Sequence, residues 1–138
     1  MPDHAPDHAL DHALDHALDH ASLVAFVPTT DLDRAREFYA GVLGLTFDSI
    51  SPFACVFTSG GTTLRVTLVG QLTPQPFTVL GWAVEDIAAL AAKLVAAGIE
   101  PKRIDGAEQD ELGIWTAPDG TRVLWFADPD GNTLSLSQ

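Results

Sequence analysis

The stretch Trp125-Phe-Ala-Asp-Pro-Asp-Gly-Asn-Thr-Leu-Ser-Leu-Ser-Gln138 sets the pattern for the whole chain. Its centre predicts a turn, because Pro129 fixes its own φ and Gly131 or Asn132 can adopt a positive φ. After the turn, hydroxyl side chains alternate with leucines, which is the period-two pattern of a strand with one polar and one apolar face. We therefore expect strand, turn and strand here.

Residues 56–66 repeat this pattern earlier in the chain, with Gly60-Gly61 as a hairpin signal at the turn. In this alignment Leu64 corresponds to Leu134, and Arg65 corresponds to Ser135. The repeat indicates that the chain holds two structurally similar units.

Each copy is preceded by a short apolar strand, an acidic residue and a helix. Asp31 and Asp86 are suited to cap the two helices at their N-termini. Gly44 and Gly98 stand where a helix end favours glycine. The sequence thus predicts an α+β fold of two βαβββ modules. The expected elements are strands 23–29, 45–49, 53–58, 62–69, 77–84, 99–104, 121–127 and 133–137, with helices 32–42 and 86–97.

Two motifs resemble the vicinal oxygen chelate superfamily, which includes glyoxalase I, bleomycin-resistance proteins and extradiol dioxygenases. They are Asp31-Leu-Asp-Arg-Ala-Arg-Glu-Phe-Tyr39, followed by Val42-Leu-Gly-Leu45, and the terminal Phe126-Ala-Asp-Pro-Asp-Gly-Asn132. The resemblance covers residues 22–138 and implies module one at 22–70 and module two at 76–138. It also implies curved mixed sheets that come together around a cavity.

The resemblance places the metal-ligand positions of the superfamily at Val24, Arg65, Val79 and Ser135. Valine has no donor atom, arginine is a permanent cation, and a lone serine hydroxyl is a weak ligand. Residues 22–138 contain no histidine that could replace them. We therefore expect no metal and no other cofactor, and we do not expect metal-dependent glyoxalase or dioxygenase activity.

Strand alternation predicts the side chains that line the cavity. The candidate ligand-binding residues are Val24, Phe26, Val56, Arg65, Val79, Trp125 and Ser135, with Glu111 and Trp115 from the apolar segment and acidic loop before the last hairpin. Each has a plainer alternative. Arg65 could form an ion pair on a solvated sheet, Trp125 could belong to the core, and Trp115 could be a lid, a dimer contact or a loop anchor.

A mostly apolar wall with one cation, a hydroxyl and an indole is typical of a small-molecule site. The favoured function is a metal-free binding protein, like the bleomycin-resistance branch, that holds a small organic molecule between its modules. The alternative is an enzyme of the superfamily, a lyase, isomerase or dioxygenase-like protein acting on a small oxygenated substrate. Glu111 or Tyr39 would then supply acid–base chemistry. Whether the protein is an enzyme stays open at this point.

The amino-acid composition limits the kinds of partner that the protein is expected to bind. The net charge is −12, and residues 23–138 still carry 14 acids against 7 bases, which argues against nucleic acid. The N-terminal sequence does not resemble a signal peptide, and no apolar run could cross a membrane. We expect a cytoplasmic protein without membrane contact, and a homodimer. The single Cys55 lies in an apolar strand and is expected to be buried.

Residues 1–21 form a separate tail that repeats Asp-His-Ala-Leu and holds all five histidines of the chain. Histidines spaced by four residues could bind Zn²⁺ or Ni²⁺. The favoured interpretation is a disordered tandem repeat, because aspartates at the same spacing repel one another and the tail holds only three leucines.

Overall fold

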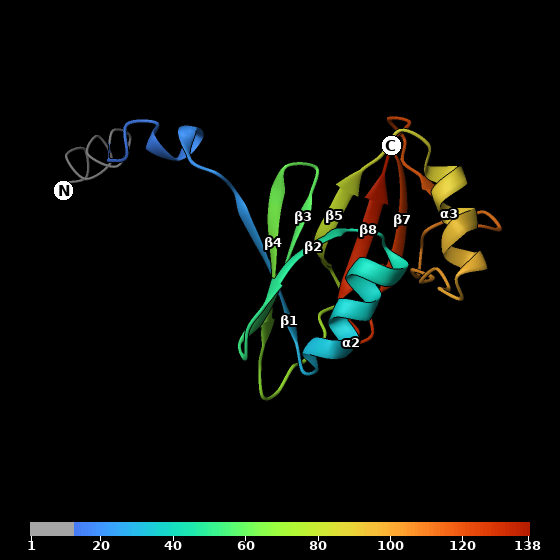
Figure 1. The fold of residues 1–138 in the computed structure, drawn as a ribbon. Coiled ribbons are helices and arrows are strands. Elements are labelled where there is room, and N and C mark those ends of the chain that lie inside the picture. The colour runs from blue at the N-terminus through green and yellow to red at the C-terminus, as the bar shows by residue number, and fades with distance from the viewer. Residues whose placement is uncertain (1–12) are drawn as a thin grey trace, which may run out of the picture.

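The computed structural model describes residues 13–138. Figure 1 shows two groups of strands with helices packed against them. Module one contains β1 (Val24–Thr29), α2 (Leu32–Arg36), η2 (Glu37–Val42), β2 (Thr46–Ile50), β3 (Ala54–Ser59) and β4 (Thr62–Leu68). Module two contains β5 (Thr78–Ala83), α3 (Ile87–Ala96), β6 (Trp115–Thr116), β7 (Arg122–Ala127) and β8 (Thr133–Ser137).

Each module forms one four-stranded mixed sheet, and the two sheets have the same topology. The strand orders are β1-β4-β3-β2 and β5-β8-β7-β6. The first and last strands of each module pair in parallel, and the remaining pairs are antiparallel. The predicted α+β fold with two βαβββ modules is confirmed.

The tail prediction falls largely on residues 1–12, which lie outside the described residues. Residues 13–21 are exposed and include a short 3-10 helix, η1 (Ala17–His20), without a buried side chain. Among residues 13–138, none of the helices is both long and apolar enough to span a bilayer.

The predicted helix ends are confirmed in both modules. The Asp31 carboxylate accepts a hydrogen bond from the Arg34 N–H at 3.1 Å, and the Asp86 carboxylate accepts one from the Ala89 N–H at 3.1 Å. Gly44 has φ +76°, as the left-handed residue after a helix requires. Local chemistry therefore starts and stops these helices at the places that the sequence indicated.

The first helix differs from the prediction in its second half. Residues 37–42 form a π-helix, in which the Leu43 N–H donates to the Phe38 carbonyl at 2.9 Å. The extra residue in this turn shifts the side chains that follow it around the helix axis. As a result Val42, which helical spacing placed on the buried face, is 41% exposed.

The predicted strand 99–104 does not form, and this prediction was wrong. Pro101 has no N–H for a ladder, and the Gln109 side chain satisfies the backbone around it. Gln109 accepts a hydrogen bond from the Ile104 N–H at 2.7 Å and donates one to the Lys102 carbonyl at 2.9 Å. The edge position of the second sheet is filled instead by β6, within the apolar segment before the last hairpin.

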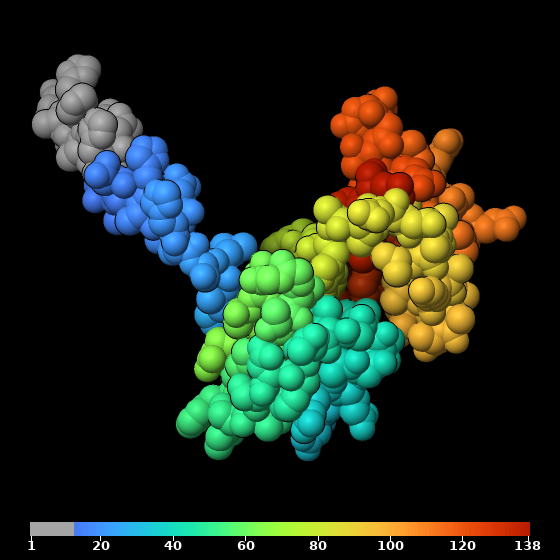
Figure 2. Space-filling model, turned by 45° about the horizontal axis from the view of Figure 1, so that its top comes forward, coloured from blue at the N-terminus to red at the C-terminus, as the bar shows by residue number. Residues whose placement is uncertain are grey.

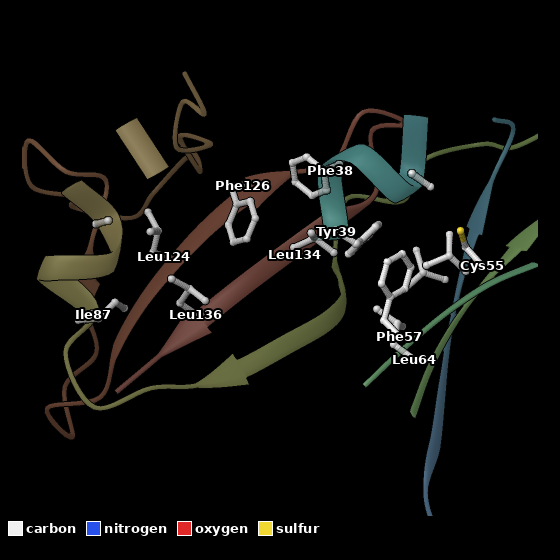
Figure 3. Packing of buried hydrophobic residues seen from close by; sticks show 14 of the residues in the cluster. Phe38, Tyr39, Cys55, Phe57, Leu64, Ile87, Leu124, Phe126, Leu134 and Leu136 are labelled. Atoms are coloured by element: carbon white, nitrogen blue, oxygen red, sulfur yellow. The ribbon is translucent and has the colours of Figure 1, made fainter. Parts of the chain in front are cut away.

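One hydrophobic core joins the two modules on the helix-covered side of the sheets. In Figure 3, Phe38 and Tyr39 lie between Phe57 of module one and Phe126 of module two. The Tyr39 ring centroid lies 5.8 Å from that of Phe57. Cys55 belongs to the same core and is fully buried, as expected, and burial raises the pKa of its thiol. Because apolar faces pack together here, the opposite sheet faces point away from the core.

Candidate functional site

The predicted wall residues of module one lie side by side on the face opposite the core. Arg65 is paired with Val56 of β3 on one side and with Phe26 of β1 on the other. Val24 follows on the same face of β1, opposite Thr63. The hairpin at Gly60-Gly61 places Val56 beside Arg65.

Module two presents a matching arrangement. Ser135 is paired with Trp125 of β7 and with Gly81 of β5. A Cβ at position 81 would lie 2.8 Å from the Ser135 hydroxyl oxygen, so glycine leaves the room that this hydroxyl occupies. Val79 lies on the same strand as Gly81, two residues away.

The two tryptophans of this sheet lie close together. Trp115 is paired with Val123, two residues before Trp125 on β7, and the two indole centroids are 6.0 Å apart with planes tilted by 34°. Trp115 therefore extends the wall at the sheet edge. Glu111 precedes it in an exposed loop, which Asp110 fixes by accepting hydrogen bonds from the N–H groups of Leu112 and Ile114.

These sheet faces are open to solvent in this chain. Phe26 is 62% exposed, Val24 is 40% exposed and Val79 is 37% exposed, which is unusual for apolar side chains on a sheet. Within residues 13–138, Arg65 has no carboxylate at ion-pair distance, so the structure gives no support to the alternative of a surface ion pair.

The residues at the metal-ligand positions of the fold do not suit a divalent metal. Val24 and Val79 offer no donor atom, and the guanidinium of Arg65 repels a cation. Residues 13–138 also contain no group of three or more histidine, cysteine, aspartate or glutamate side chains placed to hold an ion.

We predict that a chain lacking residues 1–21 binds no stoichiometric Ni²⁺, Co²⁺ or Zn²⁺, because this donor set cannot coordinate them. The measurement is metal content after purification in medium that contains each ion, with the full-length chain beside it. One metal per truncated chain would contradict the prediction. Metal present only in the full-length protein would assign binding to the histidine repeat.

The Asp-Pro-Asp-Gly-Asn turn at residues 128–132 lies outside the sheet faces described above, and it docks module two onto module one. The buried Asp128 carboxylate accepts hydrogen bonds from the Tyr39 hydroxyl at 2.7 Å and from the Asn132 side chain at 2.8 Å. Asn132 also donates to the Pro28 carbonyl at 2.9 Å. We call this set, together with Asp130 and its partners below, the inter-module clamp.

Asp130 forms the second half of the clamp. Its carboxylate accepts hydrogen bonds from the Thr29 and Thr30 hydroxyls and the Thr30 N–H, and it pairs with the Arg34 guanidinium at 2.6 Å. Burial, the largest single influence, acts to raise the pKa of Asp130. The hydrogen bonds and the nearby cation together outweigh burial, and the pKa falls below its ordinary value.

Tyr39 is consequently not suited to acid–base chemistry. Burial raises the pKa of its phenol far above the ordinary value, and the neighbouring carboxylates of Asp128 and Asp130 raise it further. The hydroxyl keeps its proton and donates a hydrogen bond to Asp128. The role suggested for Tyr39 in the enzyme alternative therefore has no support here.

A separate cavity of about 390 Å³ lies on the helix-covered side, between the end of η2 and α3. Figure 2 shows this hollow between the cyan and yellow segments, with red strand atoms visible inside it. None of the nine predicted site residues lines it. Its lining residues are Val42, Leu43, Leu45, Ser59, Trp82, Ala83, Val84, Leu90, Lys93, Leu94, Ala97, Phe126 and Leu136.

Sequence reasoning missed this cavity because Val42, Leu90 and Leu94 have the spacing of ordinary buried helix faces. In the structure Leu90 and Leu94 are only half-buried, although they lie on the apolar side of α3. No pattern in the sequence distinguishes a helix residue that faces a cavity from one that faces a filled core.

The fold and its motifs agree with comparisons to known proteins. Residues 13–136 match the family model of the Glyoxalase/Bleomycin resistance protein/Dioxygenase superfamily, and the chain belongs to this superfamily. No curated protein sequence matches the chain.

Solved structures with the same fold come from several bacteria. A putative glyoxalase family protein from Bacillus anthracis is 18% identical with a TM-score of 0.67, over 86% of this chain and 93% of that chain. Lactoylglutathione lyase from Agrobacterium tumefaciens is 19% identical with a TM-score of 0.66, over 86% and 92%. TioX from Micromonospora sp. ML1 is 18% identical with a TM-score of 0.66, over 86% and 98%. At these identities the similarity demonstrates the fold alone.

Proposed function

We propose that this protein binds a small organic molecule with an anionic oxygen on the sheet face around Arg65, without a metal ion. The observation that carries the proposal is the position of Arg65 between Phe26 and Val56, with no ion-pair partner within residues 13–138. A guanidinium offers a planar set of donors that suits carboxylate and phosphate oxygens. The apolar neighbours would contact the body of the same molecule.

The second sheet supplies complementary groups. Trp115 and Trp125 offer aromatic surface, and the Ser135 hydroxyl offers one donor and acceptor beside them. A ligand with an apolar or aromatic body and one oxyanion would use all of these groups. The proposal therefore names a class of ligand and leaves its identity to experiment.

A homodimer is part of this proposal. The sheet faces leave Val24, Phe26 and Val79 in water, and exposed apolar groups of this kind often mark an interface or a ligand site. A second copy that covers them would bring the residues of both sheets around an enclosed site. β1 and β5, which carry these residues and contact each other within the chain, would then lie inside the interface.

Native mass spectrometry of the full-length protein tests both elements at once. We expect a dimer that carries a small molecule, which is then identified after denaturation. The same molecule should be recovered unchanged after prolonged incubation with the protein. Its chemical conversion would instead assign the enzyme alternative, and a monomer without affinity for organic anions would contradict the proposal.

We predict that Arg65→Met weakens the binding of aromatic carboxylates such as 2-naphthoate. A hydrogen bond to a charged group is worth about 1.5 kcal/mol at the low end, so the dissociation constant should rise about tenfold. The affinity for 2-naphthamide, which lacks the charge, should hardly change. Isothermal titration calorimetry measures both constants.

Arg36→Met is the matched control for this variant, because it removes one exposed arginine charge from α2 on the helix-covered side. It should leave 2-naphthoate affinity at the sheet face unchanged. A different result would refute the role of Arg65: unaltered affinities combined with a thermal midpoint lowered by more than about 4 °C would identify a structural residue.

A further inference from the structure

We propose that the cavity between η2 and α3 is a second ligand site, which takes an apolar carboxylic acid with its carboxylate at Lys93. The cavity lies on the opposite side of the sheets from Arg65, so this inference is independent of the proposed function. Its volume of about 390 Å³ lies within the range of roughly 300–1,000 Å³ that is typical of small-molecule sites.

The walls of this cavity come from both modules and are almost entirely apolar. Eleven of the thirteen lining residues are aliphatic or aromatic, and only Ser59 and Lys93 are not. The floor is made by Phe126 and Leu136, whose side chains are buried in the core. A hollow of this composition favours a ligand with an apolar body, because water gains few hydrogen bonds there.

Two polar side-chain groups of the wall bond to each other. The Trp82 indole N–H donates to the Ser59 hydroxyl at 2.9 Å and ties the two modules together beside the cavity. This bond holds the indole in a fixed position as a flat wall. It leaves the Lys93 ammonium group as the charged group available to a ligand.

Lys93 determines the charge of the ligand. It is the only charged residue among those that line the cavity, and it lies on α3 next to Leu94 and one turn from Leu90 and Ala97. Within residues 13–138 no carboxylate lies at ion-pair distance from it. An anionic group at the cavity rim would pair with this ammonium while its apolar body fills the space between η2 and α3.

Decanoate is a suitable probe, with decanol as the neutral molecule of matched length. Calorimetry of the full-length chain should show saturable binding of decanoate and weaker binding of decanol. The site is located by the indole N–H signals in the NMR spectrum, since the chain has three tryptophans. Trp115→Phe and Trp125→Phe identify two of the signals, and the third belongs to Trp82. Decanoate should shift the Trp82 signal, because Trp82 lines the cavity and Trp115 and Trp125 do not.

Two kinds of substitution test separately the contribution of the Lys93 charge and the contribution of the cavity volume. Lys93→Met should weaken decanoate about fivefold, as expected for an ion pair near the surface, and should leave decanol unchanged. Lys93→Arg should restore most of the affinity. Val42→Trp places an indole at the rim from an exposed position on η2, and it should weaken both probes by at least about tenfold.

Arg65→Met separates this site from the sheet face. It removes the same charge from the other side of the sheets, so decanoate bound at the sheet face should bind more weakly, whereas the shift that decanoate causes in the Trp82 signal should stay unchanged. The proposal is overturned if decanoate shifts the Trp115 and Trp125 signals instead of the Trp82 signal. It is also overturned if Lys93→Met and Val42→Trp, both folded by thermal melting, bind decanoate as tightly as the unaltered chain.

Discussion

Asp128→Ala is expected to lower the free energy of unfolding by about 3 kcal/mol, because it leaves several buried donors without an acceptor. Asp128 is 6% exposed and accepts four hydrogen bonds: from the Tyr39 hydroxyl, the Asn132 side chain, and the N–H groups of Asp130 and Asn132. The substitution removes all four. It also breaks the hydrogen bond between the turn of module two and Tyr39 in the helix of module one. Urea unfolding followed by circular dichroism measures the loss.

Two further variants show whether the clamp is the cause. Tyr39→Phe removes only one of the four donors and should cost about 1 kcal/mol, since the carboxylate keeps its other partners. Asp105→Ala removes an exposed carboxylate from the loop after Pro101 and should change stability by less than about 0.5 kcal/mol. If Asp128→Ala costs no more than Asp105→Ala, the turn does not hold the modules together.

The clamp also shows why the sequence predicted the fold better than it predicted the contacts between modules. The turn at Asp128, the caps at Asp31 and Asp86 and the glycine at Gly44 each depend on a few neighbouring residues, so a short stretch of sequence is sufficient to recognise them. The partnership of Tyr39 with Asp128 spans 89 positions in the chain. Nothing near Tyr39 in the sequence indicates that partner.

Two errors in the predicted elements have the same origin. The π-turn at residues 37–42 depends on how Phe38 and Tyr39 pack against both sheets, and this packing overrides the regular helical spacing that placed Val42 in the core. The expected strand 99–104 is replaced by a loop because one side chain, Gln109, satisfies the backbone at Lys102 and Ile104. Both features are tertiary interactions, which apolar periodicity does not reveal.

At the candidate site, too, the sequence predicted the local features and did not predict those that depend on how the modules pack. The pairs Val56–Arg65 and Trp125–Ser135 follow from hairpin register, and both are present in the structure. How the two sheet faces are enclosed depends on the packing of the modules, which a repeat alone does not specify. The cavity beside Lys93 arises from this packing as well, since residues of η2, β5 and α3 meet there. Sequence patterning thus identifies the faces of strands and helices, whereas cavities depend on how these faces are brought together.

Gly113→Ala is expected to destabilise the protein by about 3 kcal/mol, through backbone strain and overpacking together. Gly113 is buried with φ +87°, a conformation that L-residues avoid. A Cβ at this position would lie 2.4 Å from the Cβ of Pro101 and 3.2 Å from a methyl carbon of Leu124. Neither neighbour can move freely, because Pro101 is a rigid ring and Leu124 belongs to the core. The thermal midpoint should fall by roughly 10 °C for a domain of this size.

Gly106→Ala is the matched control, because Gly106 has φ +85° and a Cβ there would have no neighbour within 4 Å. It carries the same backbone strain without the collision and should cost only about 1 kcal/mol. The difference between the two variants therefore measures the close contact with Pro101.

Gly113 also stands two residues before Trp115, so the displaced segment should move that indole away from the Trp125 indole, whose centroid is now 6.0 Å away. Near-ultraviolet circular dichroism should change in Gly113→Ala and stay constant in Gly106→Ala. Equal melting points and equal spectra for the two variants would show that the loop adapts, and that Gly113 does not position the tryptophan face.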